Sequence, residues 1–188
     1  MLNIVIFGPP GSGKGTQSVK LAEKYNLTHI STGDIFRSEI RAKTALGLKV
    51  QSIIESGELV SDDLLVDLLL SAMQKNKDTE GYLFDGYPRT TRQALDLEEL
   101  LNEVNGSVDF VLALDVPDQE LMDRLLNRAR LEGRKDDTVE VIANRLKVYH
   151  EQTRPLMDYY RSQGKLAVVD GVGSIDEIFA NLCKVIDK

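Results

Sequence analysis

Cysteine, tryptophan and histidine are scarce in or absent from this sequence. Its 188 residues include one cysteine (Cys183), two histidines (His29 and His150) and no tryptophan. A single cysteine excludes an intramolecular disulfide framework and any zinc or iron–sulfur site with several cysteine ligands. We expect Cys183, on the last predicted helix, to be buried and unreactive. We assign no functional role to either histidine.

Long hydrophobic runs and an excess of positive charge are also missing. No apolar run approaches the ~18 residues of a membrane span. The chain is apolar from its second residue and its first basic residue is Lys14, the wrong order for a secretory signal. A net charge of −7 argues against broad binding to nucleic acid or a membrane surface. We therefore expect a cytoplasmic protein whose residues 1–188 form one domain.

Short apolar runs alternate with helical patterns along the whole chain. Four runs stop at Gly or Asp, which is typical of strands buried on both faces of a parallel sheet, and a fifth at 28–31 is weaker. These four runs are 4–7, 82–84, 110–114 and 166–169. The alternation predicts an α/β fold, a five-stranded parallel sheet with helices on both faces. In such sheets ligands bind at the carboxyl ends of the strands.

Capping residues predict where several helices begin. The predicted starts are at Ser61, at Thr90 or Thr91, and at Asp118, each followed by apolar residues at helical spacing. Asp137 followed by Glu140 resembles a capping box for a further long helix. Pro155 should kink or break that helix. Apolar residues at helical spacing from Ile175 to Ile186 predict a closing helix.

A glycine-rich turn separates the first predicted strand from the first helix. Residues 8–14 satisfy the pattern G-x-x-x-x-G-K in this strand-to-helix context. Its glycines let backbone N–H groups converge on a phosphate, and Lys14 adds a positive charge at the helix N-terminus. Gly15 stands where a magnesium-binding Ser or Thr is usual, and Thr16 follows it. The turn predicts binding of a nucleoside triphosphate.

The segment GPPGSGKGTQ, residues 8–17, closely resembles the phosphate loop of the nucleoside monophosphate kinases, and of the adenylate kinases among them. The resemblance continues over the whole chain, in the same order and spacing. The matching segments are residues 31–34 with Arg37, residues 57–60, the DGYPR segment at 85–89 with Gln93, and the arginines Arg124, Arg128, Arg134 and Arg145.

The resemblance implies a reversible, Mg²⁺-dependent transfer of the γ-phosphoryl group of ATP to AMP, which gives two ADP. The implied ATP-binding residues are Gly11, Ser12, Gly13, Lys14, Gly15, Thr16, Arg124 and Arg128. The implied AMP-binding residues are Thr32, Gly33, Arg37, Leu59, Val60, Gly86, Arg89, Gln93, Arg134 and Arg145. The implied catalytic residues are Lys14, Arg89, Arg128, Arg134 and Arg145.

The residue types suit this chemistry. Arg37 and Arg89 offer planar guanidinium groups for bidentate contact with the acceptor phosphate. A phosphate acceptor has a second pKa of about 6, so it is largely ionised near neutral pH and needs no general base. Asp85, at the end of a predicted strand opposite the phosphate loop, could hold Mg²⁺ through its water ligands.

Two insertions are expected on the sheet, a helical monophosphate-binding segment at 31–60 and a short lid at 125–138. The lid contains no cysteine, and so the chain resembles the short-lid members of the family, for which we expect no zinc and a monomer. The resemblance suggests that Asp136 and Asp137 pair with lid arginines. Arg130 matches nothing in the family pattern and is expected on the surface.

Two alternatives stay open at this point. A nucleotide-switch protein shares the phosphate loop, but Asn76–Thr79 only half resembles the guanine-reading N-K-x-D segment and follows a helix instead of a strand. A UMP/CMP kinase would favour Ala in place of Thr32 and an Asn-type pyrimidine contact after Arg89, where this chain has Thr90.

Overall fold

The computed structural model describes residues 1–76, 79–133 and 138–188. Of the residues singled out from the sequence, Arg134, Asp136 and Asp137 lie outside the described residues. The lid predicted at 125–138 is therefore described only in part.

A parallel sheet forms the centre of the molecule, as predicted. Its strands are β1 (Ile4–Phe7), β2 (Thr28–Ser31), β3 (Tyr82–Asp85), β4 (Phe110–Asp115) and β5 (Leu166–Asp170). They lie in the order β2-β3-β1-β4-β5, and every neighbouring pair is parallel. The weak candidate at 28–31 is thus a strand of the sheet. Because β1 is central and parallel to its neighbours, the carboxyl ends of β1, β3 and β4 meet at one edge.

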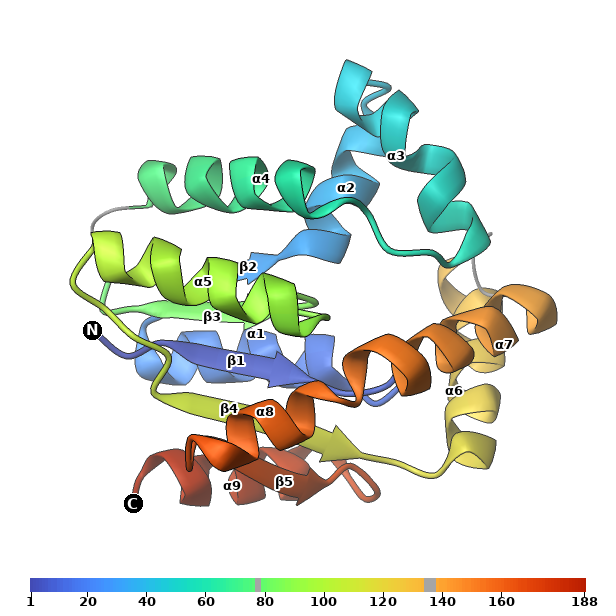
Figure 1. Cartoon of the computed structure of the whole chain (residues 1–188). Coiled ribbons are helices and arrows are strands. Elements are labelled where there is room, and N and C mark those ends of the chain that lie inside the picture. The colour runs from blue at the N-terminus through green and yellow to red at the C-terminus, as the bar shows by residue number, and fades with distance from the viewer. Residues whose placement is uncertain (77–78, 134–137) are drawn as a thin grey trace.

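Helices connect the strands and cover both faces of the sheet (Figure 1). They are α1 (Lys14–Tyr25), α2 (Thr32–Arg41), α3 (Ala45–Ser56), α4 (Asp62–Lys75), α5 (Thr91–Glu103), α6 (Asp118–Glu132), α7 (Val139–Val148), the π-helical turn η1 (Tyr149–Thr153), α8 (Leu156–Ser162) and α9 (Ile175–Ile186).

Alternating side chains of β1 divide the core into two parts. Ile4 and Ile6 pack into one cluster with side chains of α1 and α9. Val5 and Phe7 point to the opposite face and pack into a larger cluster that includes side chains of α4, α5 and α8. Successive strand residues face opposite sides of a sheet, so a strand that is apolar at every position must be covered on both. The four residues of β1 are all buried.

The edge strand β5 departs from this pattern. Val169 is buried in the cluster under α9, but Val168 is 48% exposed. The prediction that the run at 166–169 is buried on both faces is therefore wrong for Val168. On its face of the sheet α8 packs against Leu166 and leaves the outer end of the strand open to solvent.

Helix caps agree with the sequence at some positions and differ at others. Thr90 caps α5 and its side chain accepts a hydrogen bond from the Gln93 backbone N–H at 3.2 Å. Ser61 is the N-cap of α4, although its side chain makes no capping bond. Thr138 is the N-cap of α7 and its hydroxyl accepts from the Val141 N–H; Asp137, predicted to form a capping box with Glu140, lies outside the described residues.

Pro155 interrupts the α-helix as predicted. Between α7 and α8 the chain widens into η1, where the Arg154 N–H donates to the Tyr149 carbonyl, five residues earlier, at 2.8 Å. Proline has no N–H and its ring clashes with the carbonyl four residues before it. The wider turn lets the backbone keep helical dihedral angles through Arg154 and Pro155.

Two helical arms project beyond the carboxyl edge of the sheet, and the chain termini lie at the opposite end (Figure 1). One arm is formed by α2 and α3. The other is formed by α6 and α7, which are held together by a small apolar cluster of Val116, Leu121, Leu125, Ile142 and Leu146. Residues predicted to bind nucleotide are therefore carried on both arms and on the strand ends between them.

Candidate active site

A cavity of about 450 Å³ opens at the carboxyl edge of the sheet. It is bounded by the phosphate loop (residues 8–16), the end of β3 and both helical arms. The predicted residues that line it are Gly11, Gly13, Lys14, Gly15, Thr16, Gly33, Arg37, Asp85, Gly86, Arg89, Arg124, Arg128 and Arg145. We call it the donor cavity.

A second, narrower cavity adjoins the first, and we call it the acceptor cavity. The predicted residues that line it are Thr32, Gly33, Arg37, Leu59, Val60, Gly86, Arg89, Gln93 and Arg145. Gly33, Arg37, Gly86, Arg89 and Arg145 line both cavities. The structure therefore brings together nearly all described residues predicted from the sequence, around two connected spaces.

The phosphate loop has the backbone that anion binding requires. Gly11 and Gly13 have φ angles of 83° and 90°, in the left-handed region that favours glycine. Gly13 is the N-cap of α1, so the positive end of that helix faces the donor cavity. Ser12 is buried, and its Oγ has no hydrogen-bond partner in the described part of the chain.

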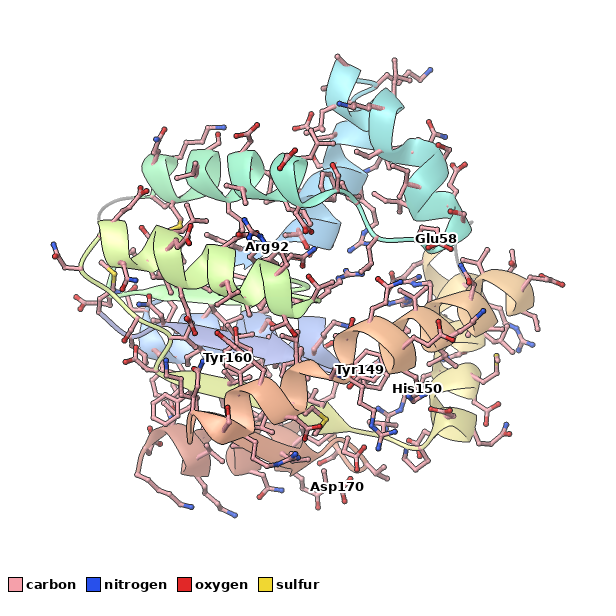
Figure 2. The ribbon with its side chains drawn as sticks, viewed as in Figure 1. Glu58, Arg92, Tyr149, His150, Tyr160 and Asp170 are labelled. Atoms are coloured by element: carbon pink, nitrogen blue, oxygen red, sulfur yellow. The ribbon has the colours of Figure 1, made fainter. Side chains whose placement is uncertain are left out.

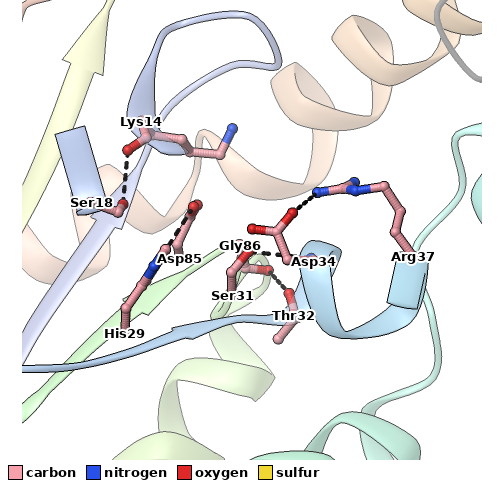
Figure 3. Close-up of polar contacts among 9 residues, drawn as sticks. All are labelled: Lys14, Ser18, His29, Ser31, Thr32, Asp34, Arg37, Asp85 and Gly86. Atoms are coloured by element: carbon pink, nitrogen blue, oxygen red, sulfur yellow. Dashed lines mark hydrogen bonds and ion pairs between the residues drawn. The ribbon is translucent and has the colours of Figure 1, made fainter. Parts of the chain in front are cut away.

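Lys14 lies close to several other positively charged side chains. Burial lowers the pKa of Lys14 to about 8, Asp85 opposes this shift, and Arg89, Arg145 and Arg128 lower the pKa further. Figure 3 shows its amino group extended into the space between the phosphate loop and the start of α2. These cations repel one another, and a bound polyanion would relieve that repulsion, so the site favours polyanions.

Asp85 ends β3 directly beside the phosphate loop. Its side chain is buried, and a Cβ added to Gly15 would lie 3.7 Å from Asp85 Oδ2. Within residues 1–76, 79–133 and 138–188, no group of three or more His, Cys, Asp or Glu side chains could hold a metal ion. A lone carboxylate suits Mg²⁺ bound through water, because Mg²⁺ retains several waters and needs few protein ligands.

His29 lies next to Asp85, a contact that was not predicted from the sequence. The distance from His29 Nε2 to Asp85 Oδ2 is 3.7 Å, which is too long for a hydrogen bond (Figure 3). β2 and β3 are adjacent, and their register pairs His29 with Leu83, so Asp85 is a diagonal neighbour two positions further along β3. No local sequence pattern joins positions 29 and 85, so only the strand order could have indicated this contact.

One carbonyl group links the segments that follow β2 and β3 at the acceptor cavity. Gly86 has a φ of 78°, and its carbonyl accepts hydrogen bonds from Thr32 Oγ1 at 3.1 Å and Arg89 Nε at 2.8 Å. Burial lowers the pKa of Arg89 to about 10, with further lowering by Arg145. The Arg89 guanidinium is thus held in place and remains a cation near neutral pH.

Arg37 is already paired with a carboxylate from its own helix. Its Nη2 lies 2.6 Å from Asp34 Oδ1, three residues earlier on α2 (Figure 3). Burial acts to raise the pKa of Asp34, but the hydrogen bond and charge of Arg37 outweigh it and the pKa lies below its usual value. The spacing of three residues could have suggested this pair from the sequence.

Gln93 is almost fully buried, with 1% of its surface exposed. Its Oε1 accepts from the Arg89 backbone N–H at 2.7 Å, and its Nε2 donates to Asp62 Oδ1 at 2.7 Å. A primary amide has two N–H donors and two acceptor lone pairs. One donor and one lone pair therefore remain for a ligand in the acceptor cavity.

On the other arm, Arg124 is held by two groups. Its Nε donates to Glu120 Oε1 at 3.0 Å, and its Nη2 donates to the Gly171 carbonyl, just after β5, at 3.1 Å. Arg128, one turn further along α6, lines the donor cavity, whereas Arg130 is exposed as expected. Glu120 precedes Arg124 by four residues, so the helical spacing could have predicted their contact.

The two arms also touch each other. Asn144 Nδ2 on α7 donates to the Ser56 carbonyl at 2.8 Å and to Glu58 Oε1 at 3.0 Å. Figure 2 shows Glu58 at the end of α3, where that helix approaches the second arm. A Cβ on Gly57 would come within 2.7 Å of Arg145 Cγ, and the φ of Gly57 is 81°. Glycine is therefore required for this close approach.

Two residues lie away from these cavities. Cys183 is buried under the sheet, as predicted. His150 contacts Asp118, with 3.2 Å between Nε2 and each carboxylate oxygen. In the part of the chain that the structure describes, no helix has the length and apolar character needed to cross a membrane.

Comparison with known proteins agrees with this geometry. A family model described as "Adenylate kinase" matches residues 6–165. The chain is 49% identical over 188 residues to the adenylate kinase of Bacteroides thetaiotaomicron, with all of both chains covered. It is 46% identical to that of Porphyromonas gingivalis, covering the whole chain and 97% of the relative, and 43% identical to that of Xanthomonas euvesicatoria, with all of both covered. The chain belongs to the adenylate kinase family.

Proposed function

We propose that this protein catalyses the reversible transfer of the γ-phosphoryl group from ATP to AMP, which yields two ADP. The observation that carries the proposal is the junction of the donor and acceptor cavities at Arg89 and Arg145, which line both. A donor and an acceptor phosphate bound on either side of these arginines would meet there. Holding two reactants in one geometry supplies much of the catalysis in such a transfer.

On the donor side, the backbone N–H groups of residues 11–16 and the Lys14 amino group bind the triphosphate. Arg128 extends the positive charge toward the transferred group, whose transition state spreads negative charge over its equatorial oxygens. We assign the contact with the ATP base and ribose to Arg124, whose side chain is held by Glu120 and the Gly171 carbonyl.

On the acceptor side, Arg37 and Arg89 bind the phosphate of AMP, and Gln93 contacts its base. The backbone at Leu59 and Val60 lines the pocket for adenine together with Thr32 and Gly33. Arg145 and Arg134 belong to the same proposal as residues that close on the transferred phosphoryl group.

Magnesium enters the proposal through Asp85. When bound with ATP, Mg²⁺ neutralises charge on the β- and γ-phosphate oxygens. Asp85 would hold the ion through its water ligands. The role suits this buried carboxylate because it lies close to the phosphate loop, with Oδ2 3.7 Å from where a Cβ at Gly15 would stand. Nothing in the acceptor needs a general base, because the attacking phosphate oxygen is already ionised near neutral pH.

The arms have separate roles in this proposal. Residues 31–60 form the monophosphate-binding insertion and residues 125–138 form a short lid, which would exclude water as a competing acceptor. We also propose that the protein acts as a monomer in the cytoplasm and needs no zinc. Sedimentation of the purified protein tests whether it is a monomer, and its metal content tests whether it needs zinc.

The alternatives from the sequence find little support. Asn76 of the segment that half resembles N-K-x-D is the C-cap of α4, and its side chain donates to the Ala72 carbonyl. The family match disfavours a nucleotide switch, and the relatives are named for adenylate rather than for a pyrimidine nucleotide.

A coupled assay of phosphoryl transfer from MgATP to AMP, CMP, UMP and GMP tests the proposal. We expect rapid, AMP-dependent turnover and much slower reaction with the other three. Turnover that is independent of any monophosphate would instead indicate a triphosphatase or a switch. A preference for CMP or UMP would make the protein a pyrimidine nucleotide kinase.

A further inference from the structure

We propose that Asp62 is a positioning residue that fixes the side-chain amide of Gln93 and thereby sets which purine the acceptor cavity accepts. This inference rests on the proposed function, since it concerns the base of the monophosphate. Asp62 matches none of the segments predicted to bind nucleotide, and it is 31 residues from Gln93 in the sequence. The two side chains meet because α4 and α5 begin side by side at the carboxyl edge of the sheet (Figure 1).

An unrestrained glutamine amide cannot distinguish two opposite hydrogen-bonding patterns. Rotation of the amide by 180° exchanges its oxygen and nitrogen with little change of shape. One orientation suits adenine, which offers an N6 donor beside an N1 acceptor. The opposite orientation suits a 6-oxopurine, which offers an O6 acceptor beside an N1–H donor. Selectivity between these bases therefore requires that the amide be held one way.

The structure holds the Gln93 amide from both ends. The Arg89 backbone N–H can only donate, so it requires the amide oxygen at its side, 2.7 Å away. An ionised carboxylate can only accept, so Asp62 requires the amide nitrogen at its side, also 2.7 Å away. Rotation would place two donors together at Arg89 and two acceptors together at Asp62. With Gln93 only 1% exposed, water could not easily replace the lost bonds.

Asp62 also connects two walls of the acceptor cavity. It lies in the first turn of α4, just after Leu59 and Val60, which line that cavity from one side. Gln93, in the first turn of α5, lines it from another. The bond between Asp62 and Gln93 thus sets the amide orientation relative to the backbone that surrounds the base.

The test compares kcat/KM for AMP and for IMP, a 6-oxopurine monophosphate, at saturating MgATP. In Asp62→Ala we expect the ratio of AMP to IMP to fall by about tenfold, while the KM for ATP stays within about twofold. Asp62→Asn can turn either its oxygen or its NH2 group toward Gln93, so it no longer requires the amide nitrogen at its side and the ratio should fall here too, though less than in Asp62→Ala. Asp63→Ala is the matched control, because Asp63 is an exposed acidic residue of the same helical turn. It should leave the ratio unchanged.

Each ratio comes from one preparation, so a loss of folded protein in a variant does not change it. Equal losses for AMP and IMP in Asp62→Ala would show a merely structural role and overturn the inference. A fall of the ratio in Asp63→Ala as large as in Asp62→Ala would attribute the effect to charge at the helix start, and would overturn it too. If the wild-type protein fails to use AMP, the proposed function itself fails; an unchanged ratio with AMP-active wild type refutes only the role of Asp62.

Discussion

The acceptor cavity and the phosphate loop of the donor cavity differ in how their polar groups are occupied before any ligand binds. Around the acceptor cavity the groups bind one another. The Gly86 carbonyl accepts from Thr32 and Arg89, and Gln93 is bonded at both ends of its amide. Around the donor cavity, Gly13, Gly15 and Thr16 are exposed, and Ser12 Oγ has no partner among residues that the structure describes.

This difference indicates two ways of recognising a nucleotide. The acceptor side is organised by hydrogen bonds whose directions are fixed in advance, which favours selectivity for one base. The donor side concentrates positive charge and backbone N–H groups on a glycine-rich turn, which favours affinity for a polyphosphate. Loss of charge in the phosphate loop should therefore act mainly on the polyphosphate, and loss of a hydrogen-bonding group at Gln93 mainly on the choice of base.

The largest effect should come from removing the charge of the phosphate loop. Lys14→Met should lower kcat by more than about 10³-fold, since charge stabilisation of the transferred group is a dominant contribution. The melting temperature should stay close to that of the wild type, because the Lys14 charge acts on phosphates and not on packing. Normal turnover in a folded Lys14→Met protein would rule out the proposed phosphate loop.

Arg128→Ala should lower kcat by about 10³-fold, by analogy with other arginines that stabilise phosphoryl-transfer transition states. That loss corresponds to about 4 kcal/mol at about 1.36 kcal/mol per factor of ten. Arg130→Ala is the matched control from the same helix, and it should change kcat by less than about twofold because surface changes have small effects. A loss below tenfold for Arg128→Ala would show that Arg128 does not act on the transferred group.

On the acceptor side, Gln93→Leu should weaken kcat/KM for AMP by about 1–3 kcal/mol, the worth of a bidentate base contact. The KM for ATP should hardly change, and the preference for AMP over CMP should narrow by a similar factor. Steady-state kinetics with both monophosphates measures this. If the variant and the wild type discriminate AMP from CMP equally, adenine recognition belongs to the backbone near Thr32 and Val60.

A smaller effect is expected on the affinity for ATP when the pH is changed. Because the pKa of Lys14 is lowered to about 8 in the free protein, its charge is complete below that pH and is lost as the pH rises through it. A bound triphosphate favours the charged form, so the affinity for ATP should be greatest below pH 8 and fall by at most about tenfold per unit above it. Calorimetric titration between pH 7 and 9.5 measures the slope. Lys14→Arg, which stays charged throughout, should abolish it.

The smallest effect should come from a zinc chelator. With Mg²⁺ in excess, chelation should change neither the melting temperature nor kcat, since no cluster of metal-ligating side chains occurs in the described ranges. A fall in melting temperature on adding the chelator would reveal a structural metal in either arm.

Much of the fold was predictable because the relevant signals are local. Runs such as Ile4–Phe7 are apolar at every position, and Thr90 precedes a helical pattern directly. Local signals also misled. The run at 166–169 was predicted to be buried on both faces, and this is wrong for Val168, because a run of apolar residues does not tell which strand lies at the edge of the sheet.

The contacts that organise the site were less predictable, because they join distant parts of the chain. His29 meets Asp85 only through the pairing of β2 with β3. Asp62 meets Gln93 only because α4 and α5 begin together. By contrast, the pairs Asp34–Arg37 and Glu120–Arg124 follow from helical spacing and were within reach of the sequence.

The π-helical turn between α7 and α8 has a consequence for insertions and deletions. Each residue advances an α-helix by about 100°, but η1 takes up one extra residue in a single wider turn, so the helix after it keeps its rotational phase. Before the turn, Ile142 and Leu146 face α6. After it, Leu156 and Tyr160 face the sheet, and Tyr149, on the turn itself, is labelled with Tyr160 in Figure 2. Deleting one residue from 149–153 would let an ordinary α-turn replace the wider one and keep Leu156 and Tyr160 toward the core. Inserting one more residue would turn both side chains about 100° away from it, so this segment should accept the loss of one residue far more readily than the gain of one.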